Sequence, residues 1–335
     1  MNELSIGDLA HTFMLRRQSA QLKQDLTRLS TELASGRTTD TSKHLGGRFA
    51  ALAEFERDLT LLTRYSSTAD EVKTQSSAMQ AALGTVQSQV GDLAEVLTLG
   101  SAAGTSTDRA TVAQEARASL GSIISAVNTR VAGRALFSGT EVSTPPLADA
   151  ETLLTDLRAA VSGATTAADV LAAADVFFDT GGGFETGIYQ GGTSDLSPFD
   201  LGAGETVTLS LRADDLAVRS VLKSVALSAL ADDPAFTLDD GESRAFLQAM
   251  AEGSLTGQDG ITRLRATLGF AEERVETAAV RITAEMTSVE FARSTLLEVD
   301  PYQTATELES VQVQLETLYT ITARSSRLSL VNFLS

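Results

Sequence analysis

The sequence predicts a mainly α protein: a discontinuous coiled-coil or helical bundle of long antiparallel helices that carries a small inserted α+β domain. Apolar residues recur at alternating spacings of three and four over long stretches, which is the period of helices that pack along a seam. Aromatic residues make up 5% of the 335 residues and proline accounts for only 5, as is typical of long helices with few breaks. The two halves of the chain also mirror each other, so we expect both termini to lie together.

The N-terminal segment has one such seam, which stops at a glycine. Its seam positions are Leu15, Leu22, Leu26, Leu29 and Leu33. The pattern ends at Ser35-Gly36, because a glycine that follows the last periodic residue favours a helix stop. Residues 37–48 are mostly polar and contain two adjacent glycines, which predicts a linker.

Two longer seams follow, one in each half of the chain. Apolar residues from Leu52 to Leu97 predict a helix of about 50 residues, which would be about 75 Å long. Those from Ile261 to Val299 predict a helix of about 40 residues, or about 60 Å. Asp300-Pro301 is expected to end it, because proline disfavours the helical conformation in the residue before it.

The last helix carries a seam that continues toward the end of the sequence. Its seam positions are Leu308, Val311, Leu315, Leu318 and Leu328. Three further apolar residues, Leu330, Phe333 and Leu334, lie on more than one face, which a two-helix pair cannot cover. We therefore expect both terminal seams to be assembly interfaces with neighbouring subunits. Alternatively, these helices close within one chain into a plain bundle.

The middle third begins at Pro145-Pro146 and has a different composition. Before it, a helix is predicted from Asp108 to about Gly133, and residues 133–140 predict the start of a β-hairpin. Beyond the prolines, residues 146–254 are predicted to form an inserted, smaller domain. Its expected helices span residues 150–161, 167–178, 214–230 and 242–251, and its expected strands residues 188–192 and 205–212.

These elements predict three domains, two of them discontinuous. The terminal helical domain would combine residues 1–36 with 301–335. The long-helix coiled-coil domain would combine residues 37–145 with 255–300, and residues 146–254 would form the inserted domain.

The composition excludes several kinds of chemistry. The absence of cysteine excludes disulfides, thiolate metal sites and cysteine nucleophiles. A formal net charge of −18 makes nucleic acid an unexpected partner, since an acidic surface repels phosphates. No stretch approaches the ~20 apolar residues of a membrane helix, so no membrane partner is expected. The first twenty residues lack the apolar core of a secretory signal.

The polar motifs do not predict a functional site either. His11 and His44, the two histidines, have no catalytic partner set and are expected to be ordinary surface residues. The glycine-rich stretch 180–187 lacks the lysine of a phosphate-binding loop, and the aspartate pairs of the second half lack the ligand spacing of a calcium loop. We expect no catalytic residue, no cofactor and no metal site.

Three stretches carry a family resemblance. They are the ending Leu328-Ser-Leu-Val-Asn-Phe-Leu334, the turn Leu29-Ser-Thr-Glu-Leu-Ala-Ser-Gly-Arg37 and the segment Gly133-Arg-Ala-Leu-Phe-Ser-Gly-Thr140. Together they resemble the hook-associated protein 3 family, the hook-filament junction proteins of the flagellin superfamily. Many members follow the N-terminal turn with a pair of aspartates, whereas this chain has the single Asp40.

The resemblance implies a flagellin-like fold and a structural role without enzymatic activity. It also implies that the terminal domain lines an inner tube and that residues 146–254 form the variable outer domain. It implies a subunit that is exported by the flagellar type III apparatus, with an export chaperone, to the extracellular flagellum. There the subunit would form a homo-oligomeric ring or helical layer between the first hook-associated protein and flagellin. Flagellin itself is the nearest alternative, and a coiled-coil adaptor that does not polymerise is a more distant one.

Overall fold

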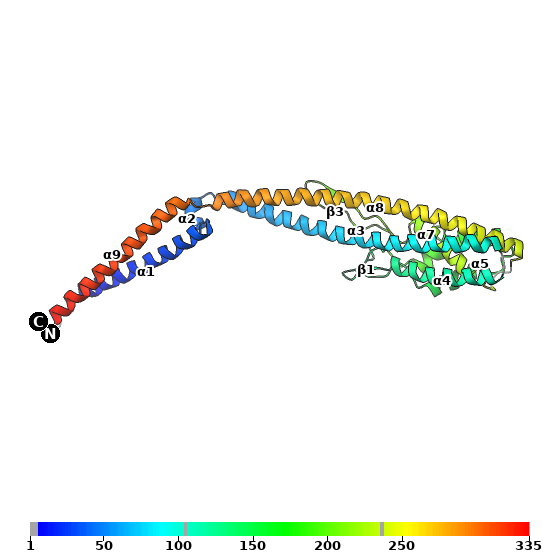
Figure 1. The fold of residues 1–335 in the computed structure, drawn as a ribbon, viewed down its shortest axis with the longest axis horizontal. Coiled ribbons are helices and arrows are strands. Elements are labelled where there is room, and N and C mark those ends of the chain that lie inside the picture. Colours follow the sequence, from blue (N-terminus) through cyan, green and yellow to red (C-terminus); the bar gives the residue numbers. More distant parts are fainter. Residues whose placement is uncertain (1–5, 104–105, 235–237, 335) are drawn as a thin grey trace. The chain divides into compact units, whose positions relative to one another are not determined.

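The chain folds as two compact units in this computed structural model. Backbone is described for residues 6–103, 106–234 and 238–334, and side chains for residues 10–101, 108–234 and 238–324. The terminal unit comprises residues 1–63 and 284–335, and the middle unit comprises residues 64–283. Both units are built largely of helices, which confirms the mainly α class predicted from the sequence (Figure 1).

In the terminal unit, helices α1 (Ile6–Ser35) and α9 (Pro301–Leu334) lie side by side and antiparallel, with both chain ends at the same end of the pair (Figure 1). Gly36 ends α1 in the left-handed region, with a φ of 68°. A short helix, α2 (Thr41–Leu45), occupies part of the predicted linker. Asp300 caps α9, because its carboxylate accepts hydrogen bonds from the backbone N–H groups of Tyr302 and Gln303. Both predicted breaks, after Ser35 and at Asp300-Pro301, are therefore confirmed.

The two long helices, α3 (Phe49–Ala103) and α8 (Asp240–Leu297), each contribute residues to both units. Within the middle unit they run antiparallel as neighbours. The Gln80 side-chain amide donates to the Arg265 carbonyl oxygen at 2.9 Å, and that of Gln87 donates to the Thr262 hydroxyl at 3.1 Å. The predicted seams are buried along this stretch, for example at Val72.

Helix α8 is longer than the sequence predicted, and this is a correction. The predicted helix 242–251 is its first part, because the chain continues as helix through Gly253, Gly257 and Gly260. Two of these glycines let α7 (Leu216–Ala229) approach closely. A Cβ on Gly257 would lie 2.8 Å from Val221, and one on Gly260 would lie 2.9 Å from Ala217. The glycines are packing positions in a continuous helix.

Three more helices and two short sheets complete the middle unit. The helices are α4 (Ser106–Val127), α5 (Ala150–Val161) and α6 (Ala167–Phe178), with one π-helical segment, η1 (Phe184–Ile188). β1 (Arg130–Val131) and β2 (Arg134–Ala135) form an antiparallel hairpin, and β3 (Phe199–Asp200) pairs with β4 (Thr206–Val207), also antiparallel. The hairpin was predicted to start at residue 133, but its first strand lies in residues predicted as the end of a helix, because α4 ends at Val127.

The predicted strands of the middle third were too long. In the segment 188–192, Tyr189 makes an isolated bridge with Leu147, and its hydroxyl donates to the Gly192 carbonyl oxygen at 2.8 Å. The backbone pairing there consists of Ala148 N–H donating to the Ile188 carbonyl oxygen at 2.9 Å and Gln190 N–H donating to that of Pro146 at 2.8 Å, so it extends over a single bridge. In the segment 205–212, strand β4 covers Thr206 and Val207.

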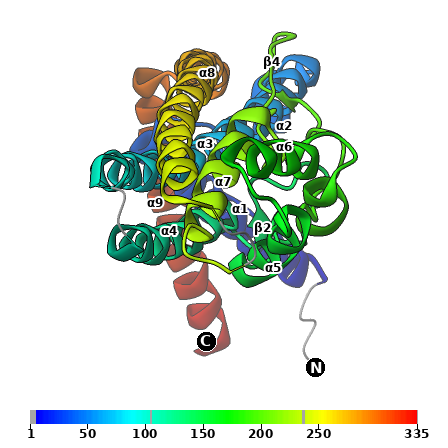
Figure 2. The same ribbon diagram turned by 90° about the vertical axis from the view of Figure 1, so that its right-hand side faces the viewer.

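One hydrophobic core runs through the middle unit and includes the segment predicted as an inserted domain. Helix α7 lies between α4 and α8 (Figure 2). Residues 133–140 are hydrogen-bonded to the segment predicted as an inserted domain. The Phe137 carbonyl oxygen accepts a hydrogen bond from Ala213 N–H at 2.9 Å, and the Ser138 carbonyl oxygen accepts one from Gly192 N–H at 2.8 Å. The observed units therefore divide within α3 and α8, whereas the sequence placed a boundary at residue 146.

Candidate assembly interface

The seam predicted at the chain ends packs inside the terminal unit, between α1 and α9 of the same chain. Leu22 and Leu29 of α1 and Leu318 of α9 are buried. The remaining described seam residues are half-buried, except the exposed Leu33: they are Leu15, Leu26, Leu308, Val311 and Leu315. The seam thus holds one chain's own termini together, and its contact with a neighbouring subunit stays a prediction. The side chains of Leu328, Leu330, Phe333 and Leu334 lie outside the described residues.

Sequence reasoning missed a second set of apolar side chains, which point away from the α1–α9 seam. Phe13 is 69% exposed, Tyr302 84% and Val313 60%. At 3.6 residues per turn, Tyr302 and Val313 lie within about 20° of each other and about 140° or more from Leu318. The signal was present in the sequence as apolar residues at positions opposite the seam, but a search for one periodic stripe passes over them. These side chains are accessible to a neighbouring molecule.

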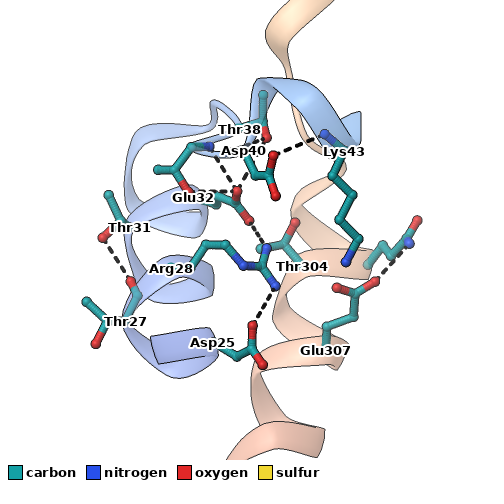
Figure 3. Close-up of polar contacts among 12 residues, drawn as sticks. Asp25, Thr27, Arg28, Thr31, Glu32, Thr38, Asp40, Lys43, Thr304 and Glu307 are labelled. Carbon is teal, nitrogen blue, oxygen red and sulfur yellow. Dashed lines mark hydrogen bonds and ion pairs between the residues drawn. The ribbon is translucent and has the colours of Figure 1, made fainter. Parts of the chain in front are cut away.

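A buried carboxylate organises one end of the helix pair (Figure 3). Glu32 of α1 is 4% exposed, and its Oε2 accepts from Arg28 Nη1 at 2.8 Å. Its Oε1 accepts from the backbone N–H and the hydroxyl of Thr39, at 2.9 and 3.0 Å. Burial by itself raises the pKa of Glu32, but the hydrogen bonds from Thr39 and the charge of Arg28 outweigh it and hold the pKa below its ordinary value of 4.5.

The same end is fixed by backbone pairing between the two chain breaks. Thr38 N–H donates to the Leu297 carbonyl oxygen at 3.0 Å, and Val299 N–H donates to that of Gly36 at 3.1 Å. The loop after α1 and the break before α9 therefore hold each other in place. The single Asp40 caps α2 through a 3.0 Å bond from Lys43 N–H.

An open cavity of about 370 Å³ lies beside this network, within the terminal unit. Side chains of both charge signs line it, including Arg28, Asp40, Lys43 and Glu307. His44 also lines it, while His11 is exposed on α1. Among the residues that the structure describes, no group of three or more histidine, aspartate or glutamate side chains is placed to hold a metal ion. No helix in the described part of the chain combines the length and apolar character needed to cross a membrane.

Paired terminal helices, and two long helices shared by both units, define a class of mainly α proteins with discontinuous helical units. Comparison with known proteins makes this class specific. Residues 256–334 match the family model of the bacterial flagellin C-terminal helical region. None of the curated proteins compared with the chain matches it.

Two solved structures are similar to this chain. A protein of Vibrio parahaemolyticus described as a flagellar hook-associated protein aligns with a TM-score of 0.54 and 18% identity, over 73% of this chain and 95% of its own. FlgL of Bacillus cereus aligns with a TM-score of 0.48 and 16% identity, over 73% of this chain and 98% of its own. The first likeness shows a shared fold. With the family match, it confirms the resemblance to the flagellin superfamily that the terminal motifs indicated.

Proposed function

We propose that this chain is a structural subunit of the bacterial flagellum and joins the hook to the filament. One observation carries the proposal: the C-terminal helical region matches that of flagellin, while a fold similar to that of a hook-associated protein extends over 73% of the chain. The pairing of α1 with α9 supports it, because two terminal helices that present apolar side chains on their outer faces are suited to polymerisation.

In this proposal each terminal helix makes different contacts on its two faces. The seam residues, such as Leu29 and Leu318, hold α1 and α9 together in each subunit. The outward side chains, such as Phe13 and Val313, contact neighbouring subunits and form a homo-oligomeric ring or helical layer. The subunit has no enzymatic role, and its neighbours are the first hook-associated protein on one side and flagellin on the other. A flagellar export chaperone and the type III apparatus deliver it to the extracellular flagellum.

Flagellin is the second candidate, because the matching family model is that of flagellin itself. Labelled antibodies on intact flagella separate the two. We expect label at the junction of hook and filament. Label along the whole filament would establish flagellin, and flagella without label would favour a coiled-coil adaptor that does not polymerise.

The outer face of α9 is tested by Val313→Asp, with Val176→Asp as the matched control. Both valines are largely exposed, and Val176 lies on α6 in the middle unit. The charge should leave the monomer's helicity unchanged in both variants, because neither side chain is packed in the chain. We expect Val313→Asp to abolish incorporation at the junction and the control to incorporate normally. Normal incorporation of Val313→Asp would show that this face makes no contact with a neighbour.

A further inference from the structure

Helix α1 carries a stretch whose exposed charges are all positive. Residues 10–24 include no aspartate or glutamate, and Arg16, Arg17 and Lys23 are exposed. The two arginines flank the outward Phe13, because at 3.6 residues per turn the three positions fall within about 100° of one another. The buried seam of α1 faces the opposite way. We call residues 10–24 the basic stretch.

Helix α9 carries a stretch of the opposite sign. Residues 302–323 include no lysine, arginine or histidine, and Glu307, Glu309 and Glu316 are exposed. Glu309 and Glu316 lie on either side of the outward Val313 along the helix, and these three positions fall within about 60° of one another. We call residues 302–323 the acidic stretch. Each stretch therefore combines an outward apolar side chain with charges of a single sign.

These opposite charges do not meet within one chain. Among the residues that the structure describes, neither arginine of the basic stretch forms an ion pair, and neither Glu309 nor Glu316 does. Lys23 lies over Tyr319 and the two helices are antiparallel (Figure 1), so the two arginines lie beside the part of α9 that follows Glu316. No acidic residue follows Glu316 in the sequence. The charges of both outer faces are therefore left for another molecule.

We propose that the basic stretch of one copy of this chain docks on the acidic stretch of a second copy, with Phe13 packed against Val313. Charge complementarity identifies the occupant, because these two stretches attract each other while a formal net charge of −18 makes copies repel elsewhere. The contact joins two different surfaces, so it is heterologous and leaves one stretch of each kind free for a further copy. The inference deepens the proposed function and rests on it for its setting in the flagellum.

The direction and the stagger of the contact follow from the helix pair. In copies that point the same way, α1 of one and α9 of the next are antiparallel, so Phe13 on Val313 places Arg17 opposite Glu309. Within one chain, Phe13 and Val313 lie about 15 to 24 Å apart along the pair, counted at 1.5 Å per residue from the cation–π contact with allowance for the reach of its side chains. A docked copy is shifted by that distance. Repeated shifts in one direction generate a helical layer, not a flat ring.

Charge reversal in the full chain tests the docking. The first variant combines Arg16→Glu with Arg17→Glu, and the second combines Glu309→Lys with Glu316→Lys. Each is analysed alone and in an equimolar mixture, by sedimentation velocity at high protein concentration. A salt concentration of about 0.1 M screens charges more than about 10 Å apart and leaves close pairs effective. We expect the wild type to associate, each variant alone to be monomeric, and the mixture to associate, because the two reversed stretches attract each other.

A matched control has the charge change of the second variant outside both stretches. Glu56→Lys and Glu290→Lys are made together, because both glutamates are exposed residues of the terminal unit. This control should associate as the wild type does. Circular dichroism should show wild-type helicity in all three variants, since every substituted side chain is exposed.

Disulfide trapping tests the register, because the chain has no cysteine of its own. Full chains with Arg17→Cys and with Glu309→Cys are mixed at high concentration and oxidised. We expect a two-chain product from the mixture at several times the yield of either variant alone. Glu290→Cys replaces Glu309→Cys in the control mixture, which should give only background.

Three results would overturn the docking. They are a wild-type chain that stays monomeric, a charge-reversed variant that associates alone as the wild type does, and a cross-linking yield equal to that of the control mixture. Variants that keep their helicity but stay monomeric when mixed would also contradict it. If charge reversal changes the helicity, the cross-linking yield alone decides, because the cysteines replace only one charge in each chain.

These tests are independent of the flagellar location. Association of purified chains that antibodies do not find on flagella would leave the docking intact and remove the proposed function. Label at the junction of hook and filament, with neither association nor cross-linking, would do the reverse.

Discussion

The middle unit and the terminal unit bury their apolar residues in different ways. In the middle unit, large side chains such as Phe137, Phe184 and Phe246 have at most 1% of their surface exposed, because helices and loops cover them from several directions. In the terminal unit, α1 and α9 have only each other along most of the pair, and their seam is a mixture of buried and half-buried leucines. A helix pair leaves most of each helix surface in contact with solvent.

The difference indicates which part of the chain folds by itself and which part awaits partners. Small assemblies of helices bury a smaller fraction of their surface than larger ones and are correspondingly less stable. We expect the middle unit to be the stable part of the monomer. The terminal pair should open more readily, and its stability should depend on the Glu32 network and on neighbouring subunits.

The largest effect is expected in the middle unit, from Phe137→Ala. Phe137 is fully buried, so the loss of its ring should cost about 3 to 5 kcal/mol of unfolding free energy. Urea denaturation followed by circular dichroism measures this loss. Phe13→Ala, at an exposed position of the terminal unit, is the control and should change the free energy by less than about 0.5 kcal/mol. Similar losses of unfolding free energy at both positions would contradict the difference between the two units.

The next effect is expected at the seam of the terminal pair, from Leu318→Ala. This side chain is 6% exposed, and its truncation should destabilise the pair by about 2 to 3 kcal/mol. Limited proteolysis of dilute monomer should cut α1 and α9 faster in this variant and leave the middle unit intact. Val313→Ala, on the outer face of the same helix, should be cut at the wild-type rate. Faster cutting of the middle unit would mean that the two units unfold together.

Glu32→Gln should remove a pH-dependent part of the terminal unit's stability, on the order of 1 to 3 kcal/mol at neutral pH. The folded chain holds the pKa of Glu32 below its ordinary value of 4.5. The unfolded state therefore binds the proton more readily, so the contribution is present above pH 4.5 and is lost as the pH falls through the lowered pKa. Hydrogen exchange of α1 amides between pH 7 and pH 3 measures it. A wild-type chain that loses no more protection than Glu32→Gln in this range would contradict the assignment.

The smallest effect is expected where Lys23 meets Tyr319. The Lys23 ammonium lies 5.8 Å from the centre of the tyrosine ring, across the α1–α9 pair. At this exposed site the interaction should contribute about 0.5 kcal/mol. A double-mutant cycle with Lys23→Gln and Tyr319→Leu, followed by hydrogen exchange of α9, isolates the coupling. Zero coupling would contradict the contribution assigned to this contact and would attribute the pairing of the two helices to the seam leucines.

Much of the helical architecture follows from the sequence, because helix period, caps and breaks are local properties. The predicted helices 150–161 and 167–178 agree with α5 and α6 residue for residue. Gly36 and Asp300 end and begin helices where the sequence placed the breaks. Strands were predicted too long, since the length of a strand depends on how far a partner runs beside it, and Tyr189 pairs with Leu147 in one isolated bridge.

The candidate assembly interface could be predicted only in part, because a sequence pattern does not identify the surface that covers it. A heptad pattern identifies a seam, so the residues from Leu15 to Leu33 and from Leu308 to Leu318 were found. The pattern does not say whether the partner helix belongs to the same chain or to another. The outward side chains, such as Phe13 and Val313, lie opposite the seam and were missed, because a single periodic stripe does not include them.

The sequence by itself determined the mainly α class, the presence of the long helices, the breaks next to the terminal helices and the motifs that resemble the flagellin superfamily. These features depend on residues a few positions apart, whose preferences act before any distant contact forms. Only the tertiary structure decided that the seams of α1 and α9 face each other within one chain, that residues 146–254 share the core of α3 and α4, and that Glu32 is buried among its donors. These features depend on contacts between residues that are far apart in the chain, and periodicity along one helix carries no information about which distant surface will cover it.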